Sequence, residues 1–372
     1  MTRVGLWLVG ARGSVATTTT VGLLAMTAGL DSPGLVTGSP LFAAVDLPDL
    51  ANLVVGGHDV SERTLLETAE HLVREGVLPA GLDLTGLAEV EARLRPGVGP
   101  AALNPVAALA QLEQDLRAFR ADNDLDECVV VLLISTEALS EDWENLDDAL
   151  AGHGQTVPPS VLYAVAALRT GCAFVDFTPS VATTVPGVRV LAEQLGLPLA
   201  GRDGKTGETL VKTTLAPMFV DRALAVRAWS GTNLLGGGDG ASLADPDRRA
   251  SKLASKAGSL RAMLGKDIEA PLAIEHIAAM GEWKTAWDHV VFEGFLGTRM
   301  TLQFTWQGCD STLAAPLVLD LARLVTAAKR AGQGGALPAL AYFFKDPLGT
   351  DEHRAARQFE DLVAWANGLS AT

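Results

Sequence analysis

The first 30 residues constrain the fold more than any other part of the chain. The apolar run RVGLWLVG at residues 3–10 has the length of a buried strand, and a glycine-containing loop follows it directly. Residues 15–30, VATTTTVGLLAMTAGL, have a helical pattern although threonine is a mediocre helix former. A strand, a glycine loop and a helix in this order predict the opening unit of an α/β fold.

Later segments continue the alternation of strands and helices. Strand-like runs occupy residues 52–57, 127–136 and 172–179, and helical patterns occupy residues 107–123 and 158–171. The run ECVVVLLIST at 127–136 is almost entirely apolar, as expected for a strand covered on both faces. The alternation predicts an α/β protein with a Rossmann-type doubly wound parallel sheet.

The pattern changes after about residue 200. Residues 200–224 read as a loop and a helix, and residues 236–260 are rich in glycine and lysine without a clear strand. Residues 289–308 alternate apolar and polar side chains, which predicts antiparallel strands. Strong helical patterns return from residue 311. We therefore expect an inserted α+β domain at 201–310, and a Rossmann-type domain made of residues 1–200 and 311–372.

Composition excludes several classes of function. The 372 residues carry a net charge of −15 and no basic cluster long enough to follow a phosphate backbone, so we expect no nucleic-acid partner. The three cysteines (Cys128, Cys172 and Cys309) are scattered, which indicates a reducing compartment and predicts no metal site. No window has about 20 uninterrupted apolar residues, and no signal peptide is recognised, so we expect a cytoplasmic protein without a membrane partner.

The first loop has the pattern of a dinucleotide-binding turn. Its glycines allow a tight turn and a close approach to a pyrophosphate, which the N–H groups at the helix start then face. An ordinary tight turn is the alternative. We expect Thr17 and Thr18 to donate to phosphate oxygens, and Thr19 and Thr20 to bond to carbonyls one turn earlier. The candidate cofactor-binding residues here are Gly10, Ala11, Arg12, Gly13, Ser14 and Val15.

A carboxylate at the end of a later strand is expected to bind the adenine ribose. Asp46 and Asp59 are both candidates, and periodicity does not choose between them. A cofactor with a 2′-phosphate would need an arginine in place of the carboxylate. The sequence therefore favours NAD over NADP.

A second loop, GRDGKTGETLVKT at residues 201–213, predicts a small-anion site. Backbone donors at a helix start would converge on a phosphate, and Lys205 would add positive charge. A solvated loop is the alternative, and Glu208 is an awkward neighbour for a phosphate unless it caps the helix. The candidate phosphate-binding residues are Thr206, Gly207, Glu208 and Thr209.

Four lysines are candidates for catalysis. Lys252 and Lys256 are four residues apart, Lys284 lies in GEWKTAWD, and Lys345 lies in YFFKDPLG. Buried lysines can polarise carbonyls and carry protons at neutral pH. Taken singly, each is more often a surface residue. The six histidines show no metal-ligand spacing.

Read together, these stretches resemble the inositol-3-phosphate synthase family, in order along almost the whole chain. LVVGGHDVS resembles its strand with Gly-Gly-Trp-Asp, which favours Asp59. LLISTEAL resembles its Ala-Asn-Thr-Glu segment and places Ser135 and Thr136 beside the nicotinamide. GRDGKTGET, NLLGGGDGASL, GEWKTAWD, CDSTLAAP and YFFKDPL resemble its remaining motifs. The resemblance places the four lysines, Asp203 and Asp310 in the catalytic site, and Asp239 at the cofactor.

The resemblance implies NAD-dependent cyclisation of glucose 6-phosphate to 1D-myo-inositol 3-phosphate. The steps are oxidation, enolisation, aldol closure and reduction, and the ammonium groups stabilise the oxyanions without a metal. The implied roles are proton shuttling for Lys252, oxyanion stabilisation for Lys284 and Lys345, and phosphate binding for Lys256. The family also implies a homotetramer.

Departures from the family pattern keep other functions open. Ser14 and Val15 replace two asparagines, Glu282 and Trp283 replace Asp-Ser, and Glu208 replaces glutamine. Gly237 and Gly238 also replace two asparagines. A paralogous carbocyclase that closes a ketose phosphate, such as fructose 6-phosphate, to a five-membered cyclitol phosphate is the nearest alternative. Other classes are a net NAD-dependent oxidoreductase and a non-catalytic nucleotide-binding protein.

Overall fold

The computed structural model describes residues 2–31, 33–99, 104–137, 146, 150, 157–237, 260–265 and 268–369. Its larger sheet has seven strands in the order β11-β6-β5-β4-β1-β2-β3, and each neighbouring pair is parallel. The strands are β1 (Val4–Val9), β2 (Leu53–Asp59), β3 (Leu94–Pro96), β4 (Glu127–Leu132), β5 (Ala173–Asp176), β6 (Pro198–Gly201) and β11 (Gly335–Ala336). The predicted Rossmann-type parallel sheet is confirmed.

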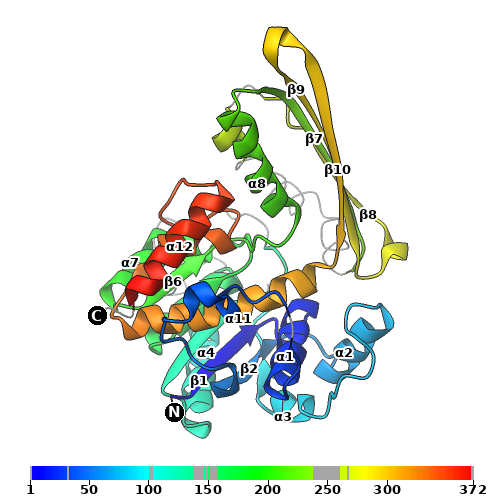
Figure 1. The fold of residues 1–372 in the computed structure, drawn as a ribbon. Helices are drawn as coiled ribbons and strands as arrows, with labels where there is room; N and C mark the ends of the chain where they lie inside the picture. Colours follow the sequence, from blue (N-terminus) through cyan, green and yellow to red (C-terminus); the bar gives the residue numbers. More distant parts are fainter. Residues whose placement is uncertain are drawn as a thin grey trace.

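Helices cover both faces of this sheet, which explains its continuous apolar strands (Figure 1). One apolar cluster includes side chains of α1 (Ser14–Thr27), α2 (Leu65–Arg74), α3 (Leu87–Ala92), α11 (Asp310–Arg330) and α12 (Ala355–Leu369). The other includes side chains of α4 (Pro105–Asp122), α6 (Pro159–Arg169) and α7 (Pro186–Gln194). All six residues of β1 are buried between the two layers.

The order of the strands reverses between β1 and β4. The chain leaves β1 toward β2 on one side, whereas β4 leads to β5 on the other. Gly10 turns the chain at this point with a φ of 89°, and a Cβ there would lie 3.0 Å from the carbonyl oxygen of Leu133. A crevice for a ligand is expected where the loops diverge at the carboxyl ends of the strands.

The smaller sheet has four strands in the order β10-β9-β7-β8. They are β7 (Ala225–Leu235), β8 (Leu272–His276), β9 (Lys284–Glu293) and β10 (Arg299–Gly308). The antiparallel pairing predicted within 289–308 is confirmed by β9 and β10, whereas β7 and β8 were not predicted. Helix α8 (Glu208–Asp221) covers one face of this sheet (Figure 1). On that face Phe219 packs with Trp229 and Val290.

Helix α11 lies across the parallel sheet (orange in Figure 1). By length and composition it would be apolar enough to cross a membrane, but 72% of its most apolar window is buried inside the protein. It is therefore a core helix. Short 3₁₀ turns complete the described structure: η1 (Val36–Gly38), η2 (Pro40–Phe42), η3 (Leu50–Asn52), η4 (Ala182–Thr184), η5 (Ala278–Met280), η6 (Phe295–Gly297) and η7 (Pro338–Phe343).

Candidate functional site

A cavity of about 360 Å³ lies at the carboxyl ends of the parallel strands and extends to the smaller sheet. Both loops singled out in the sequence line it, together with the segment that follows β4, the start of β9 and the start of α11. The predicted site residues that it brings together are Gly10, Gly13, Ser14, Val15, Ser135, Thr136, Asp203, Thr206, Gly207, Glu208, Thr209, Lys284, Asp310 and Lys345. Lys252, Lys256 and Asp239 lie outside the described residues.

The start of α1 has the features of an anion site. Gly10 and Ala11 donate their N–H groups to the carbonyl oxygen of His58 at 2.8 and 3.0 Å, which fixes the turn. Gly13 is the N-cap, no side chain caps the helix, and its first turn has no acidic residue. A Cβ on Gly13 would lie 3.2 Å from the carbonyl oxygen of Gly10. The first-turn N–H groups, which have no intrahelical partner, thus begin at the cavity wall and suit a pyrophosphate.

The four threonines of α1 divide into two pairs. Thr19 and Thr20 donate to the carbonyl oxygens of Val15 and Ala16 at 2.8 and 2.9 Å, as predicted. The hydroxyls of Thr17 and Thr18 are buried, have no partner among the described residues, and do not line the cavity. The prediction that these two hydroxyls reach phosphate oxygens is therefore wrong for this structure, because the helix turns them into the core.

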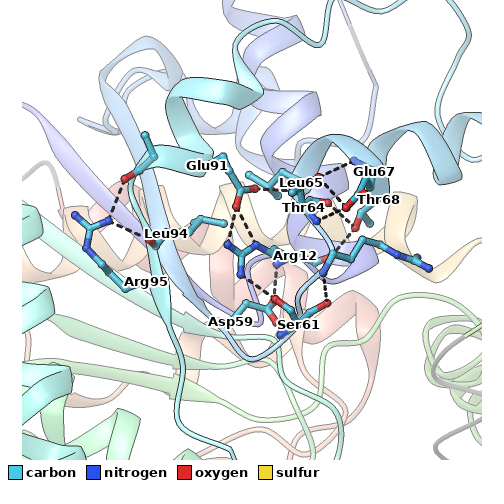
Figure 2. A network of polar contacts seen from close by, with 12 residues as sticks. Arg12, Asp59, Ser61, Thr64, Leu65, Glu67, Thr68, Glu91, Leu94 and Arg95 are labelled. Carbon is cyan, nitrogen blue, oxygen red and sulfur yellow. Dashed lines mark hydrogen bonds and ion pairs between the residues drawn. The ribbon is translucent and has the colours of Figure 1, made fainter.

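Asp59, the last residue of β2, fixes the first loop, which contains Gly10–Val15 (Figure 2). Its carboxylate accepts the N–H of Arg12 at 2.6 Å and that of Ser61 at 2.7 Å. The Arg12 guanidinium turns to Glu91, at 3.0 and 2.6 Å, and to the carbonyl oxygen of Ser61 at 2.9 Å. Asp46, the other candidate for the ribose, is exposed on a separate surface hollow.

The geometry thus favours Asp59 as the ribose carboxylate, because it lies directly beside the loop. Ala11, Arg12 and Asp59 do not line the 360 Å³ cavity itself. For Arg12, the structure shows a role in linking the loop to α3 through Glu91, so a direct contact of its side chain with the cofactor has no support here.

The second loop leads into α8, whose N-cap Gly207 has no side-chain cap. The Thr206 hydroxyl donates to Asp310 at 2.9 Å. The side chain of Glu208 is buried and pairs with Lys212, which also lies 3.0 Å from Asp288. The predicted repulsion between Glu208 and a phosphate is thus reduced by Lys212, a buried cation that the sequence analysis did not single out.

Lys205 does not point into the cavity. Asp203, Gly204 and Thr206 line the cavity on either side of it, but the Lys205 side chain is only 3% exposed and its ammonium donates to Gln358 of α12. The predicted positive charge of Lys205 therefore lies behind the loop, and its ammonium does not face the cavity. A loop position can be predicted from sequence spacing, but the rotamer depends on packing against α12.

Two lysine–carboxylate pairs face the cavity. Lys345 lies 2.7 Å from Asp203, and Lys284 pairs with Asp310. The first pair is held by a short antiparallel ladder in which Lys345 donates its N–H to the Asp203 carbonyl at 2.7 Å, and Lys205 donates to Phe343 at 2.8 Å. The two segments, more than 130 residues apart in sequence, therefore position one site together.

Several cavity residues were not predicted as ligands. Glu282 accepts a hydrogen bond from Ser14 at 3.1 Å and lies 3.4 Å from the ring of His71. Trp283, which departs from the family pattern, lines the cavity, and its indole N–H donates to the carbonyl oxygen of Glu75 at 2.9 Å. Sequence analysis also missed Phe177, Thr178, Pro179 and Asn233. The first three follow β5, so their place at a strand end was the signal available.

Comparison with known proteins agrees with this geometry. The family model described as myo-inositol-1-phosphate synthase, an NAD-binding family by its name, matches residues 37–367. Inositol-3-phosphate synthase 1 of Bacteroides thetaiotaomicron is 32% identical over an alignment of 398 positions, which covers 95% of this chain and 91% of that protein. The human protein of the same name is also 32% identical, over 88% of this chain and 63% of its own length.

A solved structure shows the same fold. Inositol-3-phosphate synthase from Caenorhabditis elegans superimposes with a TM-score of 0.89 at 22% identity, over 99% of this chain and 86% of that one.

Proposed function

Because this chain belongs to the myo-inositol-1-phosphate synthase family, we propose that it cyclises glucose 6-phosphate to 1D-myo-inositol 3-phosphate with NAD. One observation supports this most: two lysine–carboxylate pairs line the same cavity as the start of the nucleotide-binding helix. A cyclase of this kind needs cations beside the nicotinamide, because each intermediate carries negative charge on oxygen.

The residues at the first loop fit NAD. The uncapped start of α1 would hold the pyrophosphate, Asp59 the adenine ribose, and Ser135 with Thr136 the nicotinamide end. NAD supplies a hydride acceptor that returns the hydride at the end of the reaction. For Asp239 a cofactor contact stays a prediction.

The lysines supply the positive charge and the proton transfer. The Lys345 ammonium is held by Asp203 and that of Lys284 by Asp310, so both are oriented before a substrate oxyanion develops between them. The turn at Thr206–Thr209, at the start of α8, would hold the phosphate. Proton shuttling by Lys252 and phosphate binding by Lys256 stay proposals that rest on the family resemblance.

We also propose that residues 1–200 and 311–372 form the NAD-binding domain, and that 201–310 form the catalytic and oligomerisation domain of a homotetramer. The four-stranded sheet supports this, since α8 covers one face while Trp287, on the other face, is exposed. A cytoplasmic location stays a prediction.

The function is tested by supplying the protein and NAD with glucose 6-phosphate and fructose 6-phosphate in separate reactions. NMR should identify an inositol phosphate from glucose 6-phosphate. A five-membered cyclitol phosphate formed from fructose 6-phosphate alone would assign the paralogous carbocyclase instead. Glu282 and Ser14 both depart from the family pattern, and they contact each other at the cavity wall. Because altered polar groups in a site change which substrate it accepts, this contact favours testing the paralogous carbocyclase as the second candidate.

The same assay separates two other classes. A cyclase regenerates its cofactor, so NADH should not accumulate as the substrate is consumed. NADH that accumulates at the rate of substrate loss would indicate a net oxidoreductase. An absence of turnover with intact NAD binding would indicate a non-catalytic nucleotide-binding protein.

A further inference from the structure

Lys205 is a buried cation in the second loop, and its side chain lies on the side of the loop that faces away from the cavity. Its neighbours Gly204 and Thr206 line the cavity, whereas its own side chain passes to the opposite side of the loop. There the ammonium donates to the side-chain oxygen of Gln358 in α12 and lies 5.6 Å from the ring centroid of Tyr342 in η7. Gln358 is itself oriented, because its amide nitrogen donates to the carbonyl oxygen of Glu352.

These partners are neutral dipoles. In the part of the chain that the structure describes, no carboxylate forms an ion pair with Lys205, and the nearby Asp203 pairs with Lys345. The titratable groups that face it are Tyr342 and His353. His353 is influenced in turn by Asp346, Asp351 and Glu352. A buried ammonium without a counter-ion is costly, and burial lowers the pKa of Lys205 to about 7.

We propose that Lys205 is an electrostatic positioning residue for the substrate phosphate, which supplies the missing counter-charge from the front of the loop. This inference rests on the proposed function, which places the phosphate at the Thr206–Thr209 turn. Anion and ammonium then lie on opposite sides of one loop, in a medium that screens less than water. Binding of the anion and protonation of Lys205 must favour each other to the same extent.

The expected pH dependence follows from this coupling. Below pH 7 the free protein already carries the Lys205 charge, so a dianion binds at full affinity. As the pH rises through 7, Lys205 of the free protein loses its proton. Binding of the anion then requires Lys205 to take up a proton from solution, so the affinity for the anion falls. The same contact would link the phosphate site to α12 through Gln358.

Sulfate is a suitable probe because it stays a dianion from pH 6 to pH 9. Calorimetry on the NAD-loaded full-length protein would compare wild type with Lys205→Met, which keeps the side-chain volume and removes the charge. We expect Lys205→Met to bind sulfate on the order of tenfold more weakly at pH 6 and to lose most of the pH dependence. Wild-type affinity with an unchanged pH dependence in this variant would overturn the proposal.

Two further variants make the result specific. Lys329→Met removes the same charge from a lysine paired with Glu127, outside the cavity, and should leave sulfate binding unchanged. His353→Gln should retain the pH dependence. If His353→Gln abolishes that dependence while Lys205 is intact, the histidine is the responsible group and the proposal fails.

A measurement on the wild type does not depend on the folding of any variant. Calorimetry at pH 7 in two buffers with different ionisation enthalpies should show uptake of part of a proton for each sulfate bound. No uptake would contradict the proposal. If the wild type makes inositol phosphate but Lys205→Met binds sulfate as the wild type does, only this inference fails. If Lys205→Met weakens sulfate binding as expected and the wild type forms no cyclitol, the proposed function fails and the anion site stands.

Discussion

Lys345 is the residue whose replacement tests the catalytic assignment most directly. Its ammonium lies 2.7 Å from Asp203 and faces the cavity. If it stabilises an oxyanion or moves a proton, Lys345→Ala should lower kcat by about 100-fold or more, because such groups contribute 10²–10⁴-fold. NAD affinity should stay near the wild-type value, since Lys345 is not part of the α1 loop. Turnover by NMR and NAD titration by fluorescence measure the two quantities.

The matched control for this prediction is Lys329→Ala. Lys329 is also a partly buried lysine paired with a carboxylate, Glu127, but it does not line the cavity. Its loss should leave kcat within about twofold of wild type, as expected for a group that contributes only to stability. Equal kcat values for Lys345→Ala and the wild type would remove Lys345 from the mechanism.

At the scale of the element, the end of β5 should make stability depend on pH. Burial raises the pKa of Asp176 to about 7, whereas an aspartate in the unfolded chain ionises near 3.9. Between these values the unfolded chain binds fewer protons than the folded one, so the free energy of unfolding falls as pH rises. Asp176→Asn cannot ionise and keeps an oxygen acceptor for Thr178, whose hydroxyl lies 2.8 Å from the carboxylate.

Between pH 5 and pH 7 the free energy of unfolding should therefore fall by about 2 kcal/mol less in Asp176→Asn than in the wild type. Urea unfolding of both proteins at the two pH values measures the difference. The buried Asp320, whose pKa burial raises to about 6, contributes equally to both proteins and cancels. Parallel pH profiles for the two proteins would show that Asp176 ionises normally in the folded chain.

The β1–β2 pair carries a second prediction at this scale. A Cβ on Gly57 would lie 2.1 Å from the carbonyl oxygen of Leu8, within the parallel pair itself. Gly57→Ala must therefore push the strands apart beside the nucleotide loop, at a cost of about 2 kcal/mol or more. Thermal unfolding would measure this. Gly76→Ala gives a contrasting control, because a Cβ on Gly76 meets no atom within 4 Å and acts only through its positive φ.

The elements also show what sequence could and could not predict. β1, its glycine loop and α1 were predictable, because buried parallel strands are continuously apolar and the loop follows directly. β7 was missed, since its buried positions include Gly231 and Asn233 and so weaken the alternation of apolar residues. α2 carries a recognisable sequence signal, the capping box at Thr64 and Glu67.

Within the site, the loop to which a residue belongs was easier to predict than the direction of its side chain. Spacing placed Lys205 and Glu208 correctly at the second loop, but their side chains turn to Gln358 and Lys212. Gln358 lies in α12 and Lys212 in α8, so the sequence of the loop alone does not predict these contacts. The contact of Ser14 with Glu282 joins residues 268 positions apart, and only the three-dimensional fold brings them together.

At the scale of the whole molecule, the β9–β10 hairpin predicts assembly. Phe295 and Leu296 at its tip are each 88% exposed, and Trp287 lies on the sheet face away from α8. Large apolar side chains that are exposed together mark interaction sites, and the proposed homotetramer would cover these with another copy of the chain. The wild type should therefore have a mass near four times 38.8 kDa by light scattering.

Replacing both tip residues, Phe295→Ser with Leu296→Ser, should shift this mass toward smaller species, because the apolar area that association buries is lost. A control double variant, Val190→Ser with Leu195→Ser, removes two exposed apolar side chains from α7 and its C-cap, far in sequence from the hairpin tip. Its mass should equal that of wild type. Both variants should retain NAD binding, since neither pair lines the cavity. A tip variant that keeps the full tetramer mass at micromolar concentration would place the subunit interface elsewhere.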